Sequence, residues 1–151
     1  MIGEAPQEED AERNTDLIVL RLAAVRIACR VRKYTYYANP EYRQQFTVRT
    51  DRPSGAKTEL GKIIEGWGDY FFYGFSDQAQ QSLVAWRLMK LNVFRLWFNQ
   101  YMARNNGRLP GEPHENRDGT RFLAFGLSDA PEDLILSAID YEGDHAQETR
   151  T

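Results

Sequence analysis

The chain has 151 residues and a formal net charge of −3, with 42% hydrophobic and 13% aromatic residues, which predicts one compact domain with a sizeable core. Its single cysteine excludes an internal disulfide framework, and its two histidines are too few and too isolated for a zinc site. No apolar run approaches the ~20 residues of a membrane helix, and the acidic start has no secretory signal, so we expect a cytoplasmic protein outside the membrane.

Charge is distributed unevenly along the chain. Residues 1–12 carry five acids and no base, residues 13–109 carry 16 bases and seven acids, and residues 110–151 carry three bases and ten acids. A basic body between acidic ends is typical of a protein that binds a polyanion. The alternative is a solvated basic surface whose charge the two ends balance.

The same composition predicts where the folded domain begins and ends. We expect a disordered acidic tail over residues 1–14, which have almost no large apolar residue, and a second acidic tail over residues 139–151. A single domain should occupy residues 15–138.

Alternating and continuous apolar runs predict the elements of this domain. In chain order we expect strands over 17–20, 25–33 and 44–50, a helix over 56–65, strands over 69–75 and 83–89, a helix over 90–104, a loop over 108–119, a strand over 120–125 and a turn over 131–135. Three strands, a helix and an aromatic strand predict a β-meander followed by an α-crossover. The fold class is therefore α+β, with a mixed sheet flanked by helices.

The strand over 25–33 separates apolar from basic side chains. Alternation places four residues on one face and three arginines on the other, namely Val25, Ile27, Cys29 and Val31 against Arg26, Arg30 and Arg32. We expect the apolar face, with Cys29, to be buried in the core. The arginine face is expected to meet solvent, acidic neighbours or phosphates.

Aromatic and basic residues are interleaved after this strand, around a turn at Asn39-Pro40. The tyrosines are Tyr34, Tyr36, Tyr37 and Tyr42, and the basic residues beside them are Arg32, Lys33 and Arg43. Such a mixture can stack on bases while its cations hold phosphates, although tyrosines also cover sheet edges without any ligand. The predicted nucleic-acid contacts are Arg26, Arg30, Arg32, Lys33, Arg43 and Arg52.

The helix over 56–65 carries charged residues that suggest either chemistry or a plain surface. Glu59 and Lys62 are three positions apart and therefore lie on one side of the helix, with Lys57 just before them. An ordinary surface ion pair between Glu59 and Lys62 is the alternative to a functional role.

This order of elements resembles the restriction-endonuclease-like PD-(D/E)XK superfamily, especially its small proteins of phage and mobile-element type. The resemblance rests on residues 14–17, 45–49 and 68–73, with 88–97 as a closing strand and aromatic helix, and it covers about two thirds of the chain. In that family an Asp on one strand and a Glu-x-Lys on the next hold a divalent metal such as Mg²⁺.

The resemblance implies a set of catalytic residues. Asp16 matches the family's acid, while Thr47-Val48-Arg49 stands where Glu-x-Lys is expected. Glu59 would then replace the missing carboxylate, so that Asp16 and Glu59 bind Mg²⁺. Lys57 or Lys62 would position the attacking water, and Arg49 would contact the scissile phosphate.

Three functions follow. The first is a Mg²⁺-dependent nuclease acting on DNA, expected as a homodimer if it cuts both strands of a duplex. The second is a nuclease fold that has lost catalysis and binds nucleic acid through Arg26, Arg30, Arg32 and Arg49. The third is a phage-type protein that binds a host protein and no nucleic acid. We favour the nuclease-like fold acting on DNA.

Overall fold

The computed structural model describes residues 2–4, 17–19, 24–51, 53–55 and 57–141. Its strands are β1 (Ile2–Glu4), β2 (Leu17–Val19), β3 (Ile27–Arg32), β4 (Gln45–Asp51), β5 (Tyr70–Ser76), β6 (Leu83–Lys90), β7 (Glu112–Glu115), β8 (Arg121–Gly126) and β9 (Ile135–Asp140). Its helices are α2 (Tyr34–Ala38), α3 (Pro40–Arg43), α4 (Glu59–Ile64), α5 (Leu91–Arg104) and the 3₁₀ turn η1 (Glu132–Leu134). The predicted α+β class is confirmed. No helix among these residues is long and apolar enough to span a membrane.

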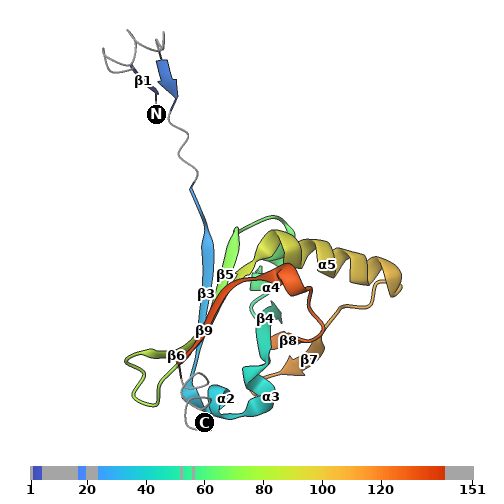
Figure 1. The fold of residues 1–151 in the computed structure, drawn as a ribbon. Coiled ribbons are helices and arrows are strands. Elements are labelled where there is room, and N and C mark those ends of the chain that lie inside the picture. The colour runs from blue at the N-terminus through green and yellow to red at the C-terminus, as the bar shows by residue number, and fades with distance from the viewer. Residues whose placement is uncertain (1, 5–16, 20–23, 52, 56, 142–151) are drawn as a thin grey trace.

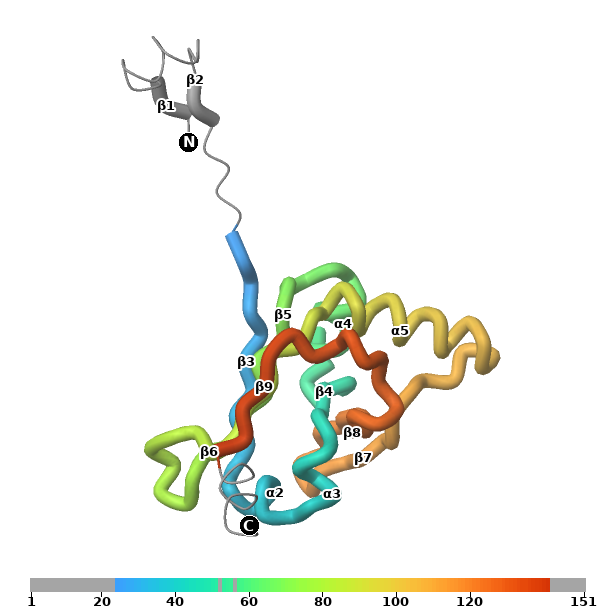
Figure 2. Tube along the Cα trace, in the orientation of Figure 1, coloured from blue at the N-terminus to red at the C-terminus, as the bar shows by residue number. Residues whose placement is uncertain are grey.

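Two sheets form the body of the molecule. The larger has the order β3-β5-β6-β9, in which β3 runs parallel to β5 and the other neighbours are antiparallel. The smaller is antiparallel, with the order β4-β8-β7. Figures 1 and 2 show the smaller sheet and α5 on one side of the larger sheet. A separate two-stranded pair joins β1 to β2.

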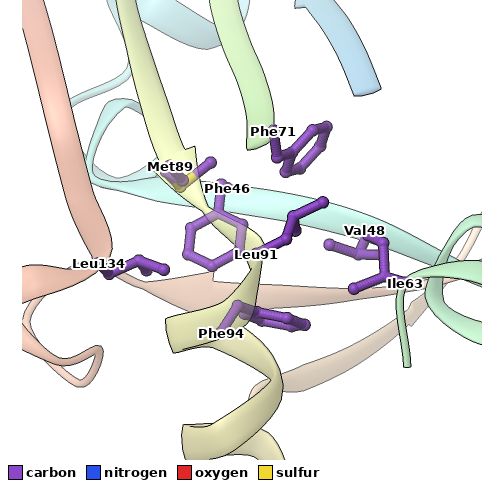
Figure 3. Close-up of a pocket in the computed structure, with 8 residues that line it drawn as sticks. All are labelled: Phe46, Val48, Ile63, Phe71, Met89, Leu91, Phe94 and Leu134. Atoms are coloured by element: carbon purple, nitrogen blue, oxygen red, sulfur yellow. The ribbon is translucent and has the colours of Figure 1, made fainter. Parts of the chain in front are cut away.

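The core lies between the two sheets and is mainly aromatic. Side chains from both sheets, α4, α5 and η1 converge there (Figure 3). Phe125 of β8 stacks on Phe46 of β4, with ring centroids 5.1 Å apart, and meets the edges of Phe94 and Trp97 of α5 at 5.3 and 5.9 Å. These edge-to-face pairs add to the free energy that apolar burial supplies.

The helix α5 shows why its sequence folds as predicted. Leu91, Phe94 and Phe98 recur at helical spacing, and all three are buried against the sheets. The helix ends where Gly107 adopts a φ of +80° and its backbone N–H donates to the carbonyl of Met102 at 2.8 Å, a conformation that glycine adopts without strain.

The predicted β-meander is wrong. β3 does not pair with β4 but runs parallel to β5, with Ile27 opposite Tyr70 and Arg32 opposite Phe75. Parallel neighbours need a long crossover, and α2, α3, β4 and α4 together provide it. The predicted turn at Asn39-Pro40 is instead the start of α3, because Asn39 Oδ1 accepts the backbone N–H groups of Glu41 and Tyr42 and Pro40 fits the first helical position.

Three short strands escaped prediction: β1, which lies inside the predicted disordered tail 1–14, and β7 and β9, whose residues are mostly exposed. β7 lies inside the predicted loop 108–119, and its four residues, Glu-Pro-His-Glu, are all exposed. Pro113 is tolerated there because β7 is an edge strand. β9 follows the predicted turn at 131–135, which the structure contains as η1, and pairs with β6 as far as Asp140.

The two faces of β3 are reversed relative to the prediction. Ile27 and Val31 are 49% and 53% exposed, and Cys29 is exposed rather than buried. Arg30 and Arg32 instead point toward the smaller sheet, where Thr47 of β4 accepts hydrogen bonds from both. The face of β3 that points inward is therefore the one whose guanidinium groups find hydrogen-bond partners there, and it is not the more apolar face.

Tyr37 of α2 ties the first half of the domain to β9. Its hydroxyl donates a hydrogen bond to Asp140 Oδ1, its side chain is 2% exposed, and the guanidinium of Arg43 lies 5.1 Å from its ring centroid. Burial, followed by the hydrogen bond to Asp140, raises the pKa of Tyr37 to about 12.

We expect Phe125→Ala to lower the free energy of unfolding by about 3–5 kcal/mol, because it removes the ring on which three aromatic neighbours pack. Val31→Thr should change it by less than about 0.5 kcal/mol, because that side chain is half exposed. Urea unfolding of both variants measures the difference. A large loss in Val31→Thr would mean that the outer face of β3 is covered.

The raised pKa of Tyr37 predicts an alkaline loss of stability. The protonated phenol is favoured in the folded state, so its contribution is complete below about pH 10 and is lost as pH rises toward 12. Between about pH 9 and 11.5, the free energy of unfolding should fall less steeply with rising pH in Tyr37→Phe than in the wild type. Tyr42→Phe, at a 45% exposed position, should keep the wild-type slope, and equal slopes in all three proteins would contradict the assignment.

Candidate nucleic-acid interface

The candidate site lies where β3 of the larger sheet faces β4 of the smaller one. Thr47 Oγ1 accepts a hydrogen bond from Arg30 Nη1 at 3.1 Å and from Arg32 Nη1 at 3.2 Å. The Tyr73 hydroxyl of β5 lies 3.3 Å from the same oxygen. A buried threonine hydroxyl thus holds two guanidinium groups side by side.

Glu59, the first residue of α4, neutralises one of these cations. Its Oε2 lies 2.6 Å from Arg30 Nη2 and also accepts the backbone N–H of Arg49 at 3.1 Å. The Arg30 and Glu59 side chains are only 17% and 21% exposed. Burial lowers the pKa of Arg30, and Glu59 opposes that shift; arginine stays charged near neutral pH all the same.

The cations surround a hollow of about 300 Å³, called the basic pocket below. It is lined by residues of β3, α2, β4, β8 and the segments beside them, namely Arg30, Val31, Arg32, Lys33, Tyr36, Arg49, Asn116, Thr120 and Phe122. Four of these side chains are cations. Within the described part of the chain, Arg32, Lys33 and Arg49 form no ion pair with a carboxylate.

Aromatic rings and one acid complete the surroundings. The guanidinium of Arg32 lies over the Tyr36 ring at 3.8 Å, and Phe122 stacks on His114 at 5.2 Å. Asp118, in the turn before β8, accepts the backbone N–H of Thr120 at 2.9 Å. That hydrogen bond is the main cause of the lowered pKa of Asp118, to which the charge of Arg49 adds slightly, so this carboxylate opposes an incoming anion.

The structure brings together some of the predicted site residues and separates others. Arg30, Arg32, Lys33 and Arg49 meet at the basic pocket. Arg26 lies apart, with its guanidinium 5.1 Å from the Trp67 ring, and Arg43 lies over Tyr37. The predicted contact Arg52 is outside the described residues.

The alternative interpretation of Glu59, a surface ion pair with Lys62, is wrong. Glu59 pairs with Arg30 instead, because its position at the start of α4 places it against β3 and β4. Lys57 pairs with Glu65 at the exposed side of α4, and Lys62 is exposed.

The described residues do not fit a magnesium site. Of the two predicted ligands, Glu59 is committed to Arg30 and to a backbone N–H, and Asp16 lies outside the described residues. No group of three metal-ligating side chains occurs in the part of the chain that the structure describes. Mg²⁺ needs several oxygen ligands, and one of the two predicted ligands lies outside the described residues, so the magnesium prediction stays a prediction.

Several lining residues could not be found from local sequence. Thr47 was noted only where a carboxylate was expected, and its role depends on two arginines 15 and 17 positions earlier. Asn116, Thr120 and Phe122 reach the basic pocket only because β8 pairs with β4. No pattern of spacing signals that pairing.

Comparison with known proteins adds no relative: no protein-family model, curated protein or solved structure matches the chain. The likeness to restriction-endonuclease-like proteins therefore stays a prediction.

We expect Glu59→Ala to destabilise the fold by about 3 kcal/mol, because it leaves the largely buried guanidinium of Arg30 without its carboxylate. Glu65→Ala breaks the exposed pair at the other end of α4 and should cost less than about 1 kcal/mol. Urea unfolding measures both variants. Similar costs would mean that the Arg30–Glu59 pair is no better shielded from water than the exposed pair.

Proposed function

We propose that this protein binds nucleic acid and that its basic pocket contacts the phosphate groups of the ligand. The observation that carries the proposal is the meeting of four cations around one hollow, with a single carboxylate paired to one of them. Like charges brought this close repel one another, and an anion in the hollow would relieve that repulsion. The planar guanidinium of arginine binds phosphate through two parallel N–H donors.

The fixed geometry of the arginines supports this function. Thr47 holds Arg30 and Arg32, and the Tyr36 ring supports Arg32 from one side. Cations held in place before binding lose less side-chain entropy when the ligand arrives. Asn116 and Thr120 add neutral polar groups at the same hollow.

The contacts that Glu59 makes favour binding of the nucleic acid over its hydrolysis. A metal-dependent nuclease needs carboxylates free to hold the cation, whereas Glu59 is committed to Arg30 and to the Arg49 N–H. We therefore propose the binding function of a nuclease-like protein without proposing a catalytic step. DNA is the ligand we would test first.

The test is the salt dependence of binding to a DNA oligonucleotide. The double variant Arg32→Gln with Arg49→Gln should weaken binding at least tenfold and lower the slope of log affinity against log salt by about 1.4–1.8, as expected for two lost phosphate contacts. Arg30 is left intact because it pairs with Glu59. Fluorescence anisotropy at several salt concentrations measures both quantities.

The control is Arg108→Gln, at an exposed position beyond the end of α5. It removes one positive charge and should keep the wild-type slope and affinity. A slope near zero in the wild type would point to a protein partner instead. A double variant that binds like the wild type would mean that the phosphates contact another surface.

A further inference from the structure

The cations of the basic pocket are concentrated rather than spread along a track. Arg30, Arg32, Lys33 and Arg49 line one hollow of about 300 Å³. Arg26 directly precedes β3 and is six residues from Arg32, which in an extended strand is a distance of about 20 Å. Its guanidinium lies over the Trp67 ring. A duplex presents its charges evenly along its length and would need cations along a comparable length. This concentration suits a single, highly charged group.

The charge of the pocket matches a terminal phosphate better than an internal one. Four cations and Glu59 leave an excess of about three positive charges at the hollow, and Asp118, which lies between the lining residues Asn116 and Thr120 in the sequence, reduces that excess by one. A terminal phosphate carries about −1.5 to −2 charges and three acceptor oxygens. An internal phosphodiester carries one charge and two free oxygens, so it would leave more of the cationic excess uncompensated.

Two rings beside the cations suit an unpaired base. Tyr36 is 38% exposed, and Phe122, already stacked on His114 on one side, lines the same hollow. Bases of single strands are free to stack on aromatic side chains, whereas bases inside a duplex are already stacked on their neighbours. A strand end supplies both the terminal phosphate and a free base.

We propose that the basic pocket takes the phosphorylated end of a single-stranded nucleic acid, with the terminal phosphate on Arg32, Lys33 and Arg49 and the terminal base against Tyr36 or Phe122. This inference rests on the proposed nucleic-acid function and names the ligand of that same site.

The test compares DNA single strands of about ten nucleotides that differ only at their ends. Strands with a 5′-phosphate, a 3′-phosphate or hydroxyls at both ends, and a closed circle of the same composition, are titrated with wild type, with the Arg32→Gln and Arg49→Gln double variant, and with Arg108→Gln. We expect one of the phosphorylated ends to bind at least tenfold more tightly than the hydroxyl-ended strand and the circle. This preference should disappear in the double variant and persist in Arg108→Gln.

The other outcomes separate this inference from the proposed function. Equal binding of all four strands, weakened by the double variant, would overturn the preference for an end and leave nucleic-acid binding intact. If a nucleoside monophosphate or inorganic phosphate competes as strongly as the strand itself, the ligand is a free phosphate compound and the strand end is excluded. If no strand binds at low salt, this inference fails, whereas the proposed function fails only if duplex DNA does not bind either.

Discussion

The structure depends on one largely buried polar contact, in which Arg30 reaches from the larger sheet to Thr47 and Glu59 beside the smaller one. Removing a guanidinium and a carboxylate from water is costly unless each finds the other with good geometry. Here the two charges meet at 2.6 Å, and Glu59 also accepts a backbone N–H from β4. The same contact joins the two sheets and holds Arg30 at the basic pocket.

That contact also explains why β3 presents its apolar side chains outward. A strand has two faces, and shifting its pairing register by one residue moves every side chain to the opposite face. With Arg30 satisfied inside, Ile27 and Val31 must point away from the second sheet. Losing their burial costs less than leaving a guanidinium in the core without partners. The basic pocket and the exposed apolar face are thus two results of one choice.

The sequence alone was sufficient to predict those helices and strands whose hydrophobic pattern is strong and local. The aromatic run of β5 and the helical spacing of Leu91, Phe94 and Phe98 in α5 identify their structures without tertiary information. The parallel pairing of β3 with β5 and the place of β4 in a second sheet could not be predicted, because several pairings bury these strands equally well. Four site cations were predicted by residue type, whereas Phe122 joins them only through strand pairing.

The parallel pairing of β3 with β5 has a consequence for how the chain folds. The backbone N–H of Arg26 donates a hydrogen bond to Asp69, 43 positions later in the chain, and the Tyr37 hydroxyl donates one to Asp140, 103 positions later. Contacts between such distant residues form only after long loops have closed, which makes folding slow. The basic pocket needs β3, β4 and β8 together, so its charged side chains gather only once strands far apart along the chain have met. A chain that stops before residue 121 keeps the arginines and lacks the wall against which they are arranged.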